Sequence, residues 1–291
     1  MIDLHAHILP GLDDGARDWN EALEMCQMAM DDGIHTIVAT PHVKRGMYTP
    51  EKELILSKVA ELNHLLLHAP CPMPPAQRHA PSPPLSNVKS KTLEVTPHVS
   101  QFTFHGLSIL PGADNAFEPD ILNQLERETA LCLAHPINAI NAINAINSSS
   151  SFRYVLLELP DYFLFPQVKD LILKLREKNI VPVLSHPERI AMIQKNHKLL
   201  HEFIQAGALS QVTAMGITGE FGKDIKKLTR TLVKKNLAHV IATDAHSRDR
   251  RPPILSRAVS EVADLIGRDK AELMVQGIPR AIIEGKAISI N

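Results

Sequence analysis

Short aliphatic segments that end in polar residues alternate with amphipathic helical segments along almost the whole chain, and this alternation limits the fold more than any other feature. Continuous aliphatic runs such as residues 155–157 suit strands that are buried on both faces, as in a parallel sheet. Strands that alternate with helices predict repeated β/α units. The seven candidate strands are residues 2–7, 36–40, 108–114, 154–158, 181–186, 209–213 and 239–246.

The segments between these strands have the apolar spacing and the capping residues of helices. Asp18 is suited to cap a first helix that Gly33 ends, because Glu21 stands three residues after the cap and glycine tolerates the left-handed turn. No Gly-x-Gly-x-x-Gly motif follows any strand, so we predict a single-domain, irregular (β/α)7 barrel, a distorted TIM barrel over residues 1–291, rather than an open doubly wound sheet. Further helices are expected at about 51–68, 166–178, 196–206, 223–235, 253–266 and 269–276.

Two stretches interrupt the alternation and are predicted to be insertions. The first, at about 69–100, begins with seven prolines between residues 70 and 84, which neither a helix nor a central strand accommodates. The second, at about 136–151, repeats Asn-Ala-Ile with a period of three, which matches neither helix nor strand. We expect the first to be an extended, mobile insertion and the second to be a surface loop that carries no chemistry.

Composition and charge exclude several classes of protein. The 291 residues carry a net charge of −1, so the chain as a whole has no electrostatic footprint for nucleic acid or an anionic membrane. No apolar run approaches the roughly 18 residues of a membrane span, and the N-terminus lacks the basic and apolar regions of a signal peptide. Cys26, Cys71 and Cys132 are too widely spaced for a zinc knuckle or a disulfide framework. We therefore expect a cytoplasmic protein that neither enters a membrane nor binds nucleic acid.

Nearly every predicted strand ends at a residue of a type that binds metals. In a β/α barrel the active site forms at the carboxyl ends of the strands, and His5 and His7 point to one face because they are two residues apart. Imidazoles and carboxylates without thiolates suit manganese, iron or zinc. Nine ligands exceed what one ion takes, so we predict two or three divalent ions that share a bridging carboxylate. The nine candidates are His5, His7, Asp14, His42, Asp114, Glu158, His186, Asp244 and His246.

Six motifs together resemble those of the PHP superfamily of phosphoesterases. They are His5-Ala-His7, Thr40-Pro-His42, Gly112-Ala-Asp114, Leu157-Glu158, Ser185-His-Pro-Glu-Arg189 and Ala242-Thr-Asp-Ala-His246. Within the superfamily, the segment DLHAHILPGLDDGA, the Arg189 motif and Asp249-Arg-Arg-Pro-Pro253 are similar to the bacterial metal-dependent protein-tyrosine phosphatases of capsule and exopolysaccharide gene clusters. The resemblance covers almost the whole chain apart from the two insertions.

This resemblance implies a PHP-type barrel, a tri-metal site usually filled by manganese, and phosphotyrosine as the substrate. The family has a glutamate as bridging ligand where this chain has Asp114, whose side chain is one methylene shorter. The implied partner is a phosphotyrosine protein, an autophosphorylating tyrosine kinase of polysaccharide export, and the resemblance is compatible with a homo-oligomer. Carried over residue by residue, His5, His7 and Asp244 would hold one ion, Glu158 and His186 a second, and Asp14, His42 and His246 a third.

The implied reaction is hydrolysis of a phosphate monoester without a phosphoenzyme. A hydroxide that bridges two ions attacks phosphorus in line, because bound metals lower the pKa of water. Arg189 and Arg251 are predicted to clamp the phosphoryl oxygens with their planar guanidinium groups. Arg248 and Arg250 are alternatives to Arg251, and His42 is a catalytic candidate as well as a ligand. A tyrosine leaving group, with a pKa of about 10, departs without a strong general acid.

A cysteine-based phosphatase is excluded. Its loop needs five residues between the thiolate and an arginine, whereas Cys71 and Arg78 have six between them. Three other functions stay open on the sequence alone. The first function is phosphotyrosine-protein phosphatase. The second is a small-molecule phosphatase of the histidinol-phosphate type or a nuclease-like phosphodiesterase, and the third is a catalytically weak metal-binding regulator. The DDGA loop and the Arg-Pro-Pro segment favour the first.

Overall fold

The structure, a computed structural model, describes residues 1–68, 106–134, 152–163 and 165–289. Both predicted insertions, at about 69–100 and 136–151, lie outside these residues. Among the described helices, none combines the length and the hydrophobicity that are needed to cross a lipid bilayer.

The described strands form two parallel sheets, one of three strands in the order β1-β2-β4 and one of six in the order β3-β5-β6-β7-β8-β9. Two predicted strands are each interrupted: the strand expected at 36–40 resumes as β3 after Thr40 and Pro41, and the strand expected at 108–114 is divided into β4 and β5 at Gly112 and Ala113. The bounds are β1 (Ile2–Ala6), β2 (Thr36–Ala39), β3 (His42–Val43), β4 (Ser108–Pro111), β5 (Asp114–Ala116), β6 (Arg153–Glu158), β7 (Ile180–Ser185), β8 (Leu209–Thr213) and β9 (Val240–Ala242).

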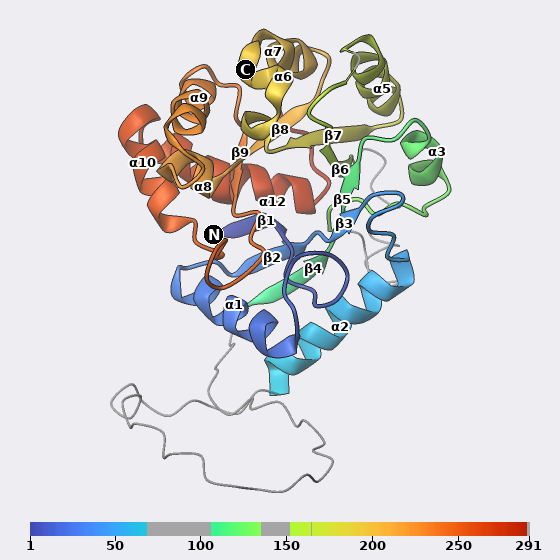
Figure 1. Cartoon of the computed structure of the whole chain (residues 1–291), viewed down its shortest axis with the longest axis vertical. Helices are drawn as coiled ribbons and strands as arrows, with labels where there is room; N and C mark the ends of the chain where they lie inside the picture. Colours follow the sequence, from blue (N-terminus) through green and yellow to red (C-terminus); the bar gives the residue numbers. More distant parts are fainter. Residues whose placement is uncertain (69–105, 135–151, 164, 290–291) are drawn as a thin grey trace, which may run out of the picture.

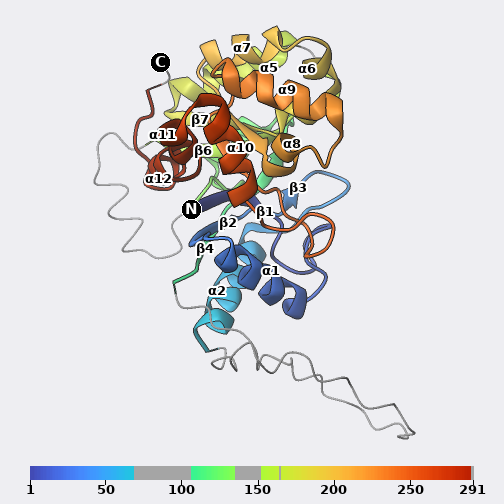
Figure 2. The same cartoon turned by 90° about the vertical axis from the view of Figure 1, so that its left-hand side faces the viewer.

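The first strand also contacts the segment that follows the last one. Ala6 forms a parallel bridge with Ala245. The amide of Asp244 donates to the carbonyl of His5, and the amide of His7 donates to the carbonyl of Ala245, each at 2.8 Å. The strands therefore follow one another in chain order, and these contacts join β1 to the end of β9 in the centre of the molecule (Figures 1 and 2). The predicted fold, an irregular (β/α)7 barrel, is confirmed.

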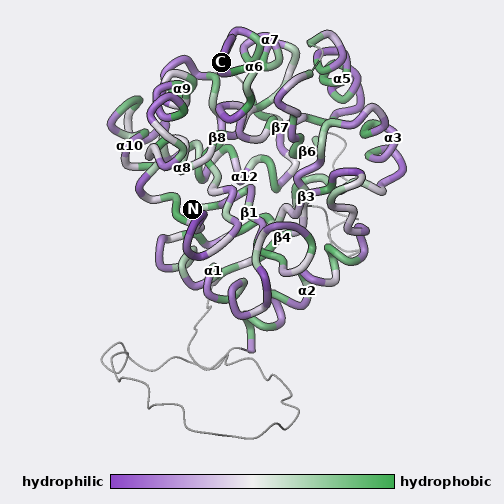
Figure 3. Tube along the Cα trace, viewed as in Figure 1, coloured by the Kyte–Doolittle hydropathy of each residue, from purple (hydrophilic) through white to green (hydrophobic). Residues whose placement is uncertain are grey.

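The predicted helices are found with small differences at their ends. Asp18 caps α1, as expected, because its carboxylate accepts a hydrogen bond from the amide of Glu21 at 2.9 Å. Hydrophobic and hydrophilic residues alternate along the helices, as the amphipathic spacing requires (Figure 3). The helices that match are α1 (Trp19–Asp31), α2 (Lys52–His68), α5 (Phe165–Glu177), α7 (Lys198–Gln205), α9 (Lys223–Lys234), α10 (Ser256–Ile266) and α11 (Arg268–Glu272), the last continued by a π-helical turn (Leu273–Gly277).

Several short helices were not expected from the sequence, because three to six residues give too few apolar repeats to show a helical period. They are α3 (Ile121–Glu126), α6 (Ala191–Lys195), α8 (Ala214–Thr218), α12 (Ile278–Ile283) and a 3-10 turn (Pro187–Arg189).

The strands contribute to two separate hydrophobic clusters, one inside the barrel and one between the strands and the helices. On β6, Tyr154 and Leu156 belong to the inner cluster, whereas Val155 and Leu157 belong to the outer one. Alternation of this kind follows from the two-residue period of a strand and explains why the aliphatic runs are continuous. The inner residues of the other strands include Ile2, Leu4, Val38, Leu110, Val181, Val183, Leu209 and Val240.

Candidate metal centre

The inner apolar residues lead directly to candidate ligands, because side chains two residues apart on a strand share a face. On four strands, the side chains that face the inside of the barrel follow one another by steps of two. In each of these four series, the last residue is an imidazole or a carboxylate at the carboxyl end of the barrel. A β-carbon on Gly112, within one of these series, would lie 2.8 Å from Val38 and 3.2 Å from Thr40, so glycine is needed for the close approach of the neighbouring strand. The series are Val38, Thr40 and His42; Leu110, Gly112 and Asp114; Tyr154, Leu156 and Glu158; and Val240, Ala242 and Asp244.

Two of the candidate ligands have left-handed backbone conformations. His186 has a φ of 31° and Asp244 a φ of 53°, although neither residue is glycine. Such conformations are uncommon for residues with a β-carbon and occur preferentially at functional sites. His186 stands directly after β7 and Asp244 two residues after β9, so in both cases the chain turns sharply where the strand has ended.

His5, His7 and Asp244 form a fully buried group at the centre of the barrel. The two Nε2 atoms of His5 and His7 lie 3.0 Å apart, so the imidazoles point to one face, as the sequence predicts. The Oδ1 atom of Asp244 lies 3.3 Å from Nε2 of His5 and 3.4 Å from Nε2 of His7. These three atoms are close enough to bind one ion, and they are the set that the resemblance assigns to the first ion.

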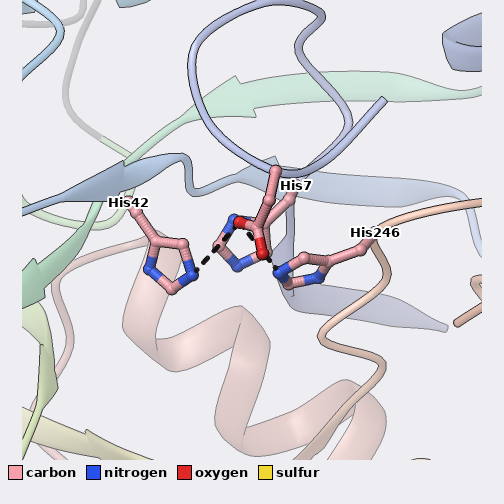
Figure 4. A group of neighbouring side chains, drawn as sticks. His7, His42 and His246 are labelled. Atoms are coloured by element: carbon pink, nitrogen blue, oxygen red, sulfur yellow. Dashed lines mark ion pairs between the residues drawn. The ribbon is translucent and has the colours of Figure 1, made fainter. Parts of the chain in front are cut away.

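A second group contains His7, Asp14, His42 and His246. Asp14 comes from the loop after β1, and its Oδ1 atom lies 3.7 Å from Nε2 of His42 and 3.6 Å from Nε2 of His246. The ring of His7 lies between the other two, with centroid distances of 4.3 Å to His42 and 3.8 Å to His246. Figure 4 shows the three imidazoles converging from separate segments of the chain. The group includes the ligands that the resemblance assigns to the third ion.

Asp114 lies between the remaining ligands. Its Oδ2 atom is 3.7 Å from Nε2 of His5 and 3.2 Å from Nδ1 of His42. Glu158 completes one group with His42 and Asp114, and His186 completes another with His5 and Asp114. The Oε1 atom of Glu158 lies 3.8 Å from Nε2 of His186. Asp114 is thus the carboxylate that two groups share, which is the position of a bridging ligand.

The chemistry of these residues fits divalent cations. Both carboxylate oxygens of Asp114 and the Nδ1 atom of His186 are buried without a hydrogen-bond partner among the described residues. Burial would raise the pKa of Asp114, but the imidazoles of His5, His42 and His186 outweigh burial and lower it. Burial lowers the pKa of His186 to about 3 and that of His246 to about 2, so both imidazoles are neutral near pH 7. Carboxylates and neutral imidazoles are the forms that bind metals.

Two residues that orient the ligands were missed in the sequence. The Oδ2 atom of Asp13 accepts hydrogen bonds from Nδ1 of His7 at 2.6 Å and from the amide of His42 at 2.8 Å. The Oε1 atom of Gln211 lies 2.8 Å from Nδ1 of His5. Both contacts leave the Nε2 atom of the histidine free to face the ligand group. Gln211 was detectable, because it stands two residues after the inner residue Leu209 on β8.

The loop that carries Asp13 depends on Gly15. A β-carbon at this position would lie 2.1 Å from the carbonyl oxygen of His7, which no side chain tolerates. The amide of Gly15 donates to Oδ1 of Asp13 at 3.0 Å, and this bond fixes the carboxylate that faces His7. The glycine of the DDGA segment is therefore required by the packing of this loop against β1.

We expect Asp13→Ala to weaken the binding of Mn²⁺ by about 10–100-fold, because the imidazole of His7 and the backbone of His42 lose the carboxylate that orients them. Isothermal titration of the metal-free protein measures the dissociation constant directly. Asp31→Ala, at an exposed position at the end of α1, is the matched control and should leave the constant unchanged. An unchanged constant for Asp13→Ala would contradict this orienting role.

Arg189 and Arg251 both contact the second oxygen of Asp244. The Nη1 atom of Arg189 lies 2.7 Å from Oδ2 of Asp244, and Nη2 of Arg251 contacts the same oxygen. Arg248 instead pairs with Glu24 and Asp249 at the surface. The structure therefore brings Arg251, rather than Arg248, to the ligand groups. The other alternative to Arg251, Arg250, has an exposed side chain.

The sequence matches the protein family described as "Capsular polysaccharide synthesis, CpsB/CapC" over residues 1–73 and 68–284. The chain belongs to this family. Its relatives include the tyrosine-protein phosphatase YwqE of Bacillus subtilis, 30% identical over 85% of this chain and 78% of the relative. The putative tyrosine-protein phosphatase CapC of Staphylococcus aureus is 31% identical over 90% and 83%. The tyrosine-protein phosphatase CpsB of Streptococcus pneumoniae is 28% identical over 99% of this chain and 100% of the relative.

The fold of this CpsB/CapC family member is also found in a solved structure. A chain from the crystal structures of YwqE from Bacillus subtilis and CpsB from Streptococcus pneumoniae, described as unique metal-dependent tyrosine phosphatases, superposes with a TM-score of 0.78. The two chains are 27% identical, and the match covers 100% of this chain and 97% of the other. The barrel described above is therefore the fold of these relatives.

Proposed function

We propose that this chain is a metal-dependent phosphatase that removes the phosphate group from phosphotyrosine in a protein. Its support is the convergence of nine ligand-type residues and two arginines at one end of a barrel whose relatives are named tyrosine-protein phosphatases. The convergence on Asp244 carries the proposal, because one carboxylate faces histidine ligands through Oδ1 and two phosphate-binding guanidinium groups through Oδ2.

The metal content that we propose is two or three divalent ions, with manganese favoured over iron or zinc. Such ions, when bound, activate water and neutralise charge on the phosphoryl oxygens. His5, His7 and Asp244 would hold one ion; His7, Asp14, His42 and His246 would surround another; and Asp114, Glu158 and His186 complete the set. His42 also lies close to Asp114 and Glu158, and we propose it both as a ligand and as a catalytic residue.

The roles of the two arginines follow from their geometry. A guanidinium group presents parallel N–H donors that match two oxygens of a phosphoryl group. Asp244 holds both guanidinium groups beside the ligands before substrate arrives, so little reorganisation is required on binding. A phenolate leaving group needs little protonation, so the proposed hydrolysis, which forms no phosphoenzyme, requires no strong general acid.

The biological substrate that we propose is an autophosphorylating tyrosine kinase of capsule or exopolysaccharide export, and the reaction would take place in the cytoplasm. The family description, capsular polysaccharide synthesis, supports this setting. We also propose that residues 1–291 form one PHP-type phosphatase domain with insertions at about 69–100 and 136–151.

A comparison of three substrates tests this function. With Mn²⁺ present, kcat/KM for a phosphotyrosine peptide and for p-nitrophenyl phosphate should exceed that for histidinol phosphate by at least about tenfold, because the proposed site serves an aryl ester. Protein treated with a chelator is the blank and should release no phosphate. A preference for histidinol phosphate would instead identify a small-molecule phosphatase, and metal binding without any turnover would identify a regulator.

A further inference from the structure

A cleft of about 300 Å³ opens beside the ligand groups at the carboxyl ends of β5, β6 and β7. Glu158, His186 and Arg189 line the part of the cleft that belongs to the candidate metal centre. The rest of the lining consists of five apolar residues, Ala116, Phe117, Leu159, Pro160 and Ile190, together with Lys44 and Asp161. A volume of about 300 Å³ is at the lower end of the range for small-molecule sites, so the cleft suits a single side chain.

Backbone pairing fixes Phe117 next to the ligand Glu158. Ala116 pairs with Glu158 in the parallel register of β5 and β6. The amide of Phe117 then donates to the carbonyl oxygen of Glu158 at 2.8 Å. This bond continues the ladder by one residue, and Phe117 and Glu158 both line the cleft.

The rest of the cleft wall is also anchored. The loop after β6 is tied to α6, because Oδ1 of Asp161 accepts a hydrogen bond from the amide of Ala191 at 3.3 Å and Met192 accepts one from the amide of Phe163 at 3.2 Å. Phe117 follows β5 and Ile190 follows β7, so they stand on opposite sides of β6 in the sheet order. An apolar group in the cleft would thus be flanked on both sides.

The charges of the cleft indicate which apolar group it receives. Arg189 and Lys44 are the two cationic residues of its lining, beside the acidic residues Glu158 and Asp161 and the five apolar residues. A phosphorylated aromatic ring matches both features, since its phosphate is anionic and its ring packs well against Phe117.

We propose that this cleft holds the ring of the phosphorylated tyrosine, and that Phe117 is the residue that selects aryl over alkyl phosphate monoesters. The proposal rests on the proposed function and adds the position of the substrate ring and the side chain that recognises it. Phe117 does not contact the reacting atoms, so its effect should appear in the choice of substrate rather than in the loss of all hydrolysis.

The test measures selectivity in the manganese-loaded full chain. We expect Phe117→Ala to lower the ratio of kcat/KM for a phosphotyrosine peptide to kcat/KM for β-glycerophosphate by about tenfold, mainly through a higher KM for the peptide. Phe117→Tyr retains the ring and should keep the ratio within about twofold. The preference for binding phenylphosphonate over methylphosphonate, measured by calorimetry, should fall by a similar factor in Phe117→Ala.

Phe152→Ala is the matched control, because Phe152 stands before β6, at the opposite end of the strand that Glu158 ends. Its selectivity ratio should equal that of the unmodified chain, and metal content should be the same in all variants. If Phe117→Ala retains the full ratio while the unmodified chain hydrolyses the peptide, the ring position is wrong and the proposed function stands. If the unmodified chain hydrolyses no aryl phosphate, the proposed function itself is wrong.

Discussion

Replacing Asp244 with alanine is expected to lower kcat/KM for p-nitrophenyl phosphate by about 10³-fold or more and to reduce the bound manganese. The side chain is 1% exposed and faces ligand imidazoles with one oxygen and two guanidinium groups with the other. Burial would raise the pKa of Asp244, but His5, His7, His186 and Arg251 outweigh burial and hold it well below its usual range. Its loss therefore removes a candidate metal ligand and leaves the arginines without their shared anion.

The same change also destabilises the fold, because it leaves partly buried arginines unpaired. Asp244→Asn retains the shape of the side chain and separates the two effects: we expect it to fold but to bind less metal. Thermal unfolding, metal analysis and kinetics are measured on both variants. Asp249→Ala, in the same loop and 73% exposed, is the control and should match the unmodified chain. Normal metal content together with normal turnover in Asp244→Asn would show that the centre lies elsewhere.

On four strands the candidate ligands continue the inner face of the strand, and this alternation can be followed in the sequence. Val38 leads to His42 and Leu156 leads to Glu158 by steps of two, so a buried aliphatic run indicates where the next polar side chain points. Gln211 follows the same rule from Leu209, yet it was missed because glutamine is not a usual metal ligand. Its contact with Nδ1 of His5 shows that the rule locates residues that orient ligands as well as the ligands themselves.

Other features depend on contacts that a single sequence does not display. The interruption of the second strand at Thr40 and Pro41 follows from pairing, since β2 pairs with β4 and β3 pairs with β5. The role of Asp13 depends on a loop that folds back against His7, and only three-dimensional packing reveals why Gly15 is needed there. The cleft beside Glu158 is formed by residues at or directly after the ends of β3, β5, β6 and β7, which are distant in the chain.

Arg189→Ala and Arg251→Ala are each expected to lower kcat/KM by about 10²–10³-fold while the bound metal changes little. Both guanidinium groups contact Asp244 beside the candidate ligands, and removing either one would take away donors that we propose stabilise the phosphoryl oxygens. Lysine at these positions should restore only part of the activity, because a single ammonium group cannot reproduce a planar pair of donors. Steady-state kinetics with the phosphotyrosine peptide, together with metal analysis, measures both quantities.

Arg248→Ala and Arg250→Ala are the controls for this prediction, because they remove the same charge from the same loop. Arg248 pairs with Glu24 and Asp249 at the surface, and the Arg250 side chain is exposed, so kcat/KM should stay within about twofold in both variants. A uniform loss across Arg248, Arg250 and Arg251 would indicate general electrostatic attraction of the substrate, which added salt would weaken. A loss confined to Arg189 and Arg251, and insensitive to salt, requires direct contact with the phosphoryl group.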